Sequence, residues 1–114
     1  MPKGIMVVQS APVDPAHEDE YNDWYDNTHV PEICAVPGFV SARRYKVHTA
    51  EGSAAGEAAG AAAAPAYLAI YEIDADDLEI PLAELRARRA AGRSRGTGAL
   101  RLDPPPVVTI YELL

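Results

Sequence analysis

Cysteine, tryptophan, phenylalanine and long apolar runs are all scarce in this sequence. Cys34 is the single cysteine among 114 residues, which excludes an internal disulfide. Because no apolar leader or cleavage pattern follows the N-terminus either, we expect a protein of the reducing cytoplasm. No apolar run approaches the roughly 20 residues that a membrane-spanning helix needs, so we expect no membrane partner.

Positive charge is scarce as well. Lysine and arginine total 10, against 17 aspartates and glutamates, which gives a formal net charge of −7. Nucleic acids and anionic membranes attract proteins through positive charge, so we expect neither as a partner. The sequence also has no histidine pair at helical i, i+4 spacing, no Cys/His cluster and no phosphate-binding glycine loop. We therefore expect no metal and no cofactor.

A chain of this length has room for one domain, residues 1–114. Residues 50–66 consist almost entirely of Ala, Gly, Glu and Ser, a composition typical of a flexible loop between two strands. A domain this small leaves much of its surface exposed, so a second copy of the chain would be a natural source of further burial.

Four strands and two helices are predicted from the hydrophobic pattern and the capping residues. The strands are 5–9, 39–48, 67–73 and 107–113, and the helices are 16–29 and 81–91. Asp14 and Pro15 are typical of the start of the first helix. Pro31 lacks the N–H that a helix interior uses and restricts Val30, so we expect that helix to end or kink just after His29.

The order β-α-β-β-α-β is that of a ferredoxin-like α+β fold, an antiparallel sheet with both helices on one face. Strands 67–73 and 107–113 are apolar on both faces, so the face without helices needs a cover. A symmetric dimer that packs sheet against sheet supplies one. In strand 39–48, alternation predicts Phe39, Arg43 and Tyr45 on one face and Arg44 on the other.

The segment 20–32 holds the densest cluster of reactive side chains. Tyr21, Tyr25 and His29 follow one another at four-residue intervals along one helix face, and Trp24 borders that row. His29 is expected beside unpaired carbonyls at a helix break, which would favour a protonated imidazole and make it a candidate acid, base or hydrogen-bond donor. The alternative is that the aromatic residues are core and His29 only caps the helix end.

Several short motifs resemble the dimeric α/β-barrel superfamily, nearest its EthD-like branch. They are Trp24-Tyr25, His29, Pro31, Val36-Pro37-Gly38-Phe39 and Arg43-Arg44-Tyr45. The resemblance covers nearly the whole chain and implies a homodimer with a cavity between the first helix and the sheet, with His29 and Trp24 near its mouth. The superfamily includes cofactor-free monooxygenases, lactone isomerases, polyketide cyclases and haem-handling enzymes, so haem on an axial His29 follows only from this analogy.

The resulting hypothesis is a small dimer that acts on a hydrophobic, aromatic or polyketide-like molecule by cofactor-free proton transfer, as an isomerase, cyclase or monooxygenase. His29 would move the proton, and Tyr25 and Tyr21 would hydrogen-bond an oxygen substituent. Trp24 would stack on the ring. An inward-facing Arg43 would stabilise negative charge, whereas an outward-facing Arg43 would be a solvated charge.

Tyr71 and Tyr111 are candidate substrate contacts in the barrel interior, although strand tyrosines also serve as core or interface. Cys34 has no activating partner in the sequence and is expected to be a small buried group.

Two other functions stay open. One is a non-catalytic ligand-binding or accessory protein that uses the same pocket, and the other is a structural or protein-interaction dimer whose cavity is collapsed.

Overall fold

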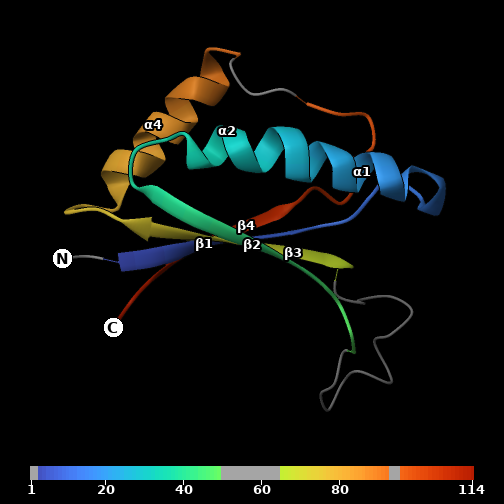
Figure 1. The fold of residues 1–114 in the computed structure, drawn as a ribbon, viewed down its shortest axis with the longest axis horizontal. Coiled ribbons are helices and arrows are strands. Elements are labelled where there is room, and N and C mark those ends of the chain that lie inside the picture. The colour runs from blue at the N-terminus through green and yellow to red at the C-terminus, as the bar shows by residue number, and fades with distance from the viewer. Residues whose placement is uncertain (1–2, 50–64, 93–95) are drawn as a thin grey trace.

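An antiparallel sheet of four strands, ordered β2-β3-β1-β4, forms one layer of the molecule, and the helices form the other (Figure 1). This computed structural model describes residues 3–49, 65–92 and 96–114, so most of the loop predicted over 50–66 lies outside the described residues. The strands are β1 (Lys3–Ser10), β2 (Phe39–Lys46), β3 (Tyr67–Asp74) and β4 (Val107–Glu112). The helical segments are η1 (Pro15–His17), α1 (Glu18–Trp24), η2 (Tyr25–His29), α2 (Val30–Cys34) and α4 (Glu79–Ala90).

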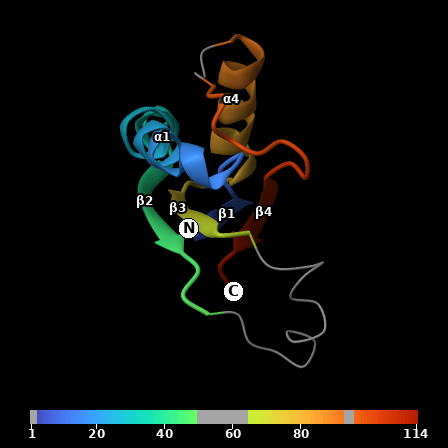
Figure 2. The same cartoon turned by 90° about the vertical axis from the view of Figure 1, so that its right-hand side faces the viewer.

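Both helical units lie on the same face of the sheet. Figure 2 shows α1 above β2 and β3, and α4 beside it, on the side of β1 and β4. This arrangement and the strand order define a ferredoxin-like α+β fold, which confirms the fold class predicted from the sequence. None of the helices in the described ranges is long and apolar enough to cross a bilayer.

The core lies between the helices and the two central strands, β1 and β3. Alternate residues of each strand are buried there, because successive side chains of a strand point to opposite faces. Met6 from β1 packs with Tyr71 and Ile73 from β3, and each is at most 1% exposed. Leu82 and Leu85 bring α4 onto this core.

We expected the first helix to end or kink just after His29. It does not end there but continues to Cys34. A π-helical segment, η2, lies in its middle, and the N–H of Val30 donates to the carbonyl of Tyr25, five residues back. Pro31 then stands in the first turn of α2, where a missing N–H costs least. The helix therefore accommodates Pro31 with a wider turn instead of a stop.

Strand β2 begins with an irregularity that reverses the predicted faces. Phe39 pairs with Ile73 and Ser41 pairs with Glu72, so one extra residue is inserted between them. Phe39 is buried under the helices, whereas Arg43 and Tyr45 lie on the opposite face. The prediction that Phe39 and Arg43 share a face was therefore wrong, because simple alternation does not count an inserted residue.

The turn before β2 requires glycine. Gly38 has φ of 102°, in the left-handed region, and a Cβ built there would lie 2.8 Å from the Cβ of Pro81. This close approach lets the start of α4 pack against the turn. The turn occupies residues 35–38, directly before β2.

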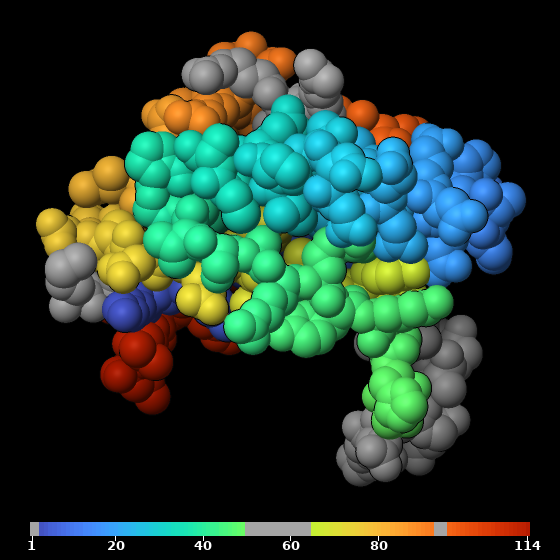
Figure 3. Space-filling model, viewed as in Figure 1, coloured from blue at the N-terminus to red at the C-terminus, as the bar shows by residue number. Residues whose placement is uncertain are grey.

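The sheet face opposite the helices is apolar and open. In Figure 3 the helices form a continuous layer above β2, while the C-terminal residues project on the other side of the sheet. A shallow concavity of about 690 Å³ lies on the open face. Among its lining residues, Tyr111 is 55% exposed and Tyr45 is 46% exposed.

Candidate functional site

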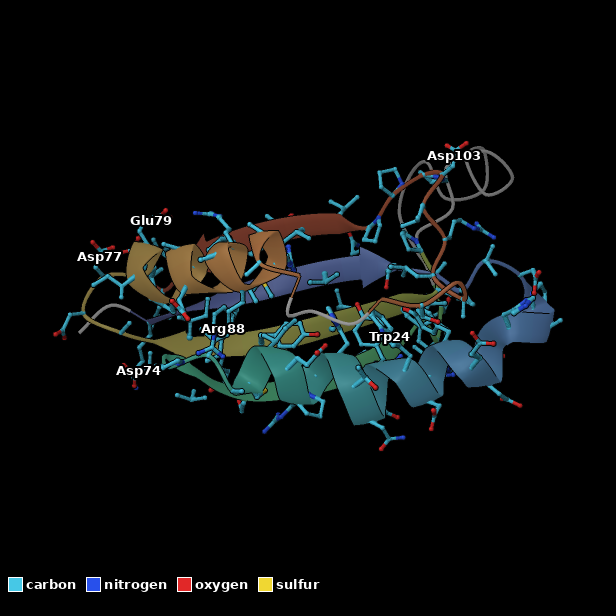
Figure 4. The ribbon with its side chains drawn as sticks, turned by 90° about the horizontal axis from the view of Figure 1, so that it is seen from above. Trp24, Asp74, Asp77, Glu79, Arg88 and Asp103 are labelled. Carbon is cyan, nitrogen blue, oxygen red and sulfur yellow. The ribbon has the colours of Figure 1, made fainter. Side chains whose placement is uncertain are left out.

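A second cavity, of about 350 Å³, lies on the helical side of the sheet. Trp24, Tyr25 and His29 from the first helix form one wall. The remaining lining residues come from α4, β1, β4 and the segment before β4: Arg89, Val8, Val108, Gly96, Leu100 and Pro106. Figure 4 shows Trp24 on the side of the first helix that faces this segment. The cavity therefore lies between the two helical units, mostly within apolar walls.

The imidazole of His29 stacks on the indole of Trp24, with ring centroids 4.4 Å apart and an interplanar angle of 19°. Tyr25 meets the same imidazole edge-on, with centroids 5.1 Å apart. The Nδ1 atom of His29 is buried and has no hydrogen-bond partner among the described residues. The histidine is thus held by aromatic rings on two sides.

Burial, together with the smaller effect of the positive charge of Arg89, lowers the pKa of His29 to about 4. The imidazole is therefore neutral near neutral pH and accepts a proton or hydrogen bond instead of supplying a proton. The prediction that His29 is protonated at a helix end was wrong. The helix continues past His29, so the unpaired carbonyls of a helix end do not favour a proton there, and the apolar walls and Arg89 disfavour one.

The hydroxyls of Tyr21 and Tyr25 were predicted to bond a ligand, but in the structure both bond a side chain of β1. Ser10 at the end of β1 bonds the hydroxyl of Tyr21 at 2.6 Å and that of Tyr25 at 3.4 Å. Both tyrosines are almost fully buried, and burial raises the pKa of Tyr21 to about 12. Tyr21 belongs to the core and does not line the cavity, whereas Tyr25 contributes to the cavity wall. Sequence reasoning missed Ser10, although Ser10 continues the alternation that buries Met6 and Val8.

Arg44, and not Arg43, reaches the helical side of the sheet. Its guanidinium lies 4.5 Å from the ring centroid of Tyr25, and it donates to Asp26 and to Asn22, both at 2.8 Å. These contacts tie β2 to the first helix. Arg44 is therefore a structural clamp between the helix and the sheet.

Besides Tyr21, three further predicted binding residues are not brought to the cavity beside His29. Arg43 and Tyr111 line the open face on the other side of the sheet. Tyr71 is fully buried in the core, and its hydroxyl has no partner among the described residues. Burial also raises the pKa of Tyr71. The site thus assembles Trp24, Tyr25 and His29 from the predicted set.

Arg89 also lines the cavity, although the sequence analysis did not predict it as a site residue. It lies in the last turn of α4, and its charge acts on His29 although the two are 60 positions apart in the chain. Only the packing of α4 beside the first helix places it there. No group of three or more His, Cys, Asp or Glu is positioned to hold a metal within the described ranges.

The fold and the cavity define a ferredoxin-like α+β domain with a small pocket between its helical units. A family model described as Domain of unknown function (DUF4286) matches residues 7–79, and the chain belongs to this family. The chain is also similar to the crystal structure of an ethyl tert-butyl ether d (EthD) family protein from Bacillus halodurans C-125. The two share 17% sequence identity with a TM-score of 0.59, over 100% of both chains.

This likeness confirms the EthD-like form of the ferredoxin-like fold that the sequence motifs predicted. At that level of identity it establishes the fold alone. No curated protein matches the chain. The argument for function therefore depends on the chemistry of the cavity.

Proposed function

We propose that this protein binds a small, planar, mostly apolar molecule in the cavity beside Trp24 and acts on it by cofactor-free proton transfer to His29. The observation that carries the proposal is a neutral histidine stacked on an indole in the wall of a cavity of about 350 Å³. Apolar walls with few polar groups are typical of small-molecule sites. An aromatic or polyketide-like ring system fits these walls.

The chemical step is the removal of a proton from the bound molecule. A neutral imidazole accepts a proton from an enol, a phenol or a carbon next to a carbonyl group. The resulting anion is the first intermediate of an isomerisation, a cyclisation or an oxygenation of an enolised ring. The buried hydroxyls of Tyr21 and Tyr25 hold the helix on β1 through Ser10 and thereby fix the position of His29.

The second candidate function is binding without catalysis, as a carrier or accessory protein. One observation favours it: the pKa of His29, at about 4, lies well below neutral pH. A general base is most effective when its pKa is near the working pH. In this case His29 accepts a hydrogen bond from a ligand hydroxyl and no bond is broken.

The proposal needs no cofactor. The cavity volume is near the lower end of the roughly 300–1,000 Å³ typical of small-molecule sites, and the imidazole lies flat on Trp24. Haem on an axial His29 therefore does not fit this site.

We also propose that the protein is cytoplasmic. A single cysteine, half-buried at position 34, supports this proposal.

We further propose a homodimer that pairs the open sheet faces into a dimeric α/β barrel. The exposed apolar side chains on this face, among them Tyr45, Tyr111 and Leu113, support a cover of similar character. The rim carries both charge signs, with Lys3 and Arg43 against the acidic side chains of β3 and β4. A two-fold interface can pair such a surface with itself.

The main test uses 2-tetralone, an aromatic ketone with an enolisable CH₂ group. Trp24 is the only tryptophan, so its single indole N–H signal in proton–nitrogen NMR reports binding at the cavity wall. Hydrogen–deuterium exchange of the CH₂ group reports proton removal. We expect the protein to shift the indole signal on binding and to accelerate exchange several-fold over buffer.

The variant His29→Phe keeps an aromatic ring against Trp24 but removes the proton acceptor. We expect it to bind 2-tetralone and to lose the accelerated exchange. His48→Phe, an exposed histidine beyond the end of β2, is the matched control and should exchange like the natural protein. Binding without accelerated exchange would favour the carrier function, and an unchanged indole signal would contradict both functions.

A further inference from the structure

Arg89 differs from the two other arginines near the end of α4. Arg86 pairs with Glu79 at 3.1 Å, and Arg88 pairs with Glu84 at 2.8 Å. The guanidinium of Arg89 has no ion pair with any residue that the structure describes. Yet Arg89 is the arginine of this helix that lines the cavity of His29.

Among the residues that the structure describes, none in the cavity wall carries a negative charge. The lining includes Arg89 and no aspartate or glutamate, although acidic residues exceed basic ones in the whole chain. The charge of Arg89 acts on two side chains of the cavity wall, His29 and Tyr25. Arg89 itself is exposed at the surface of α4. The cavity thus has a mostly apolar interior and, at one side, a cation without an ion pair to the described part of the chain.

Building on the proposed function, we propose that the molecule bound in this cavity is an organic anion, a planar ring compound with a carboxylate that pairs with Arg89. The ring would lie against Trp24, Leu100 and Val108, and the carboxylate would reach the exposed guanidinium. Guanidinium groups bind carboxylates through paired hydrogen bonds, which makes arginine selective for this group.

The other arginines near the first helix and the sheet do not serve this role. Arg44 is already bonded to Asp26 and Asn22. Arg43 lies on the opposite face of the sheet. Arg89 therefore takes the part that the sequence analysis gave to Arg43, namely the stabilisation of negative charge on the ligand.

The experiment compares 2-naphthoate with 2-naphthamide, two ligands of nearly the same shape of which only the first is charged. Binding is followed through the Trp24 indole N–H signal at low salt. We expect the natural protein to bind 2-naphthoate about fivefold more tightly, a preference of the size that a partly exposed ion pair provides. Added salt should reduce this preference, because it screens exposed charges.

Arg89→Gln should abolish the preference and leave the affinity for 2-naphthamide nearly unchanged. Arg86→Gln removes the same charge from the same helix away from the cavity, so the preference should remain. Equal binding of both ligands to the natural protein would overturn the anion proposal and leave the small-molecule function intact. A preference that survives Arg89→Gln would also overturn it. Absence of binding by both ligands would count against the proposed function itself.

Discussion

The stacked pair of Trp24 and His29 exists because of the π-helical turn between them. The two residues are five positions apart, which in an α-helix of 3.6 residues per turn places side chains about 140° apart around the axis. In η2 the hydrogen bonds run to the fifth residue back, and the two rings lie 4.4 Å apart. The π turn therefore creates the cavity wall, in agreement with the frequent occurrence of such turns at functional sites.

His29 and His17 should titrate in different pH ranges. Burial and the charge of Arg89 lower the pKa of His29 to about 4, whereas the hydrogen bond that the His17 ring donates to the Asp14 carboxylate raises the pKa of His17 above its ordinary value. Proton NMR of the imidazole signals across the acid range measures both. A His29 that titrates near its ordinary value of 6.5 would contradict the neutral, desolvated imidazole on which the site depends.

Buried His29 should also make the free energy of unfolding depend on pH. The unfolded chain takes up a proton on this residue near pH 6.5, whereas the folded protein does so only near pH 4. The stabilisation is thus present above about pH 6.5 and is lost as the pH falls towards about 4. A shift of this size corresponds to a loss on the order of 3 kcal/mol.

Urea unfolding of the natural protein and of His29→Phe across this pH range isolates the contribution. The variant lacks the titrating group but keeps all other ionisable residues, so its stability should fall less steeply as the solution is acidified. Parallel pH profiles for the two proteins would show that His29 has the same pKa in the folded and unfolded states.

Substitution of the neighbouring residues Arg43 and Arg44 on β2 should change the free energy of unfolding by different amounts. Arg44→Met removes the bonds to Asp26 and Asn22 and the contact over Tyr25, and we expect a loss of about 2 kcal/mol. Arg43→Met alters the open face and removes no contact to the first helix, so we expect a smaller loss than for Arg44→Met. Denaturant unfolding at one protein concentration measures both. The reverse order would contradict the register of β2 after its irregularity.

The proposed dimer should depend on Tyr111. Tyr111→Glu places a negative charge on the apolar open face, next to the acidic side chains of the same concavity. We expect light scattering to give twice 12.2 kDa for the natural protein and about 12.2 kDa for the variant. Ile80→Glu, at an equally exposed position on α4, is the control and should stay dimeric. A monomeric natural protein would contradict the sheet-to-sheet pairing.

Local sequence patterns alone were sufficient to predict most of the strands and helices of the fold. The apolar runs predicted all four strands, and Asp14 with Pro15 marked the start of the first helix, because these signals depend on neighbouring residues. The grouping of Trp24, Tyr25 and His29 on one helix also followed from a single short segment. Such information is contained in the chain itself.

Tertiary structure decided what spacing could not. The inserted residue near Ser41 exchanged the faces of Arg43 and Arg44, since the pairing with β3 sets the register. The helix crossed Pro31 by a π turn because packing on the sheet holds both of its halves in place. Arg89 reached the cavity only through the packing of α4, a long-range contact that leaves no mark in the local pattern. The sequence determined the elements and the candidate chemistry, while packing between distant elements determined which charges face the cavity.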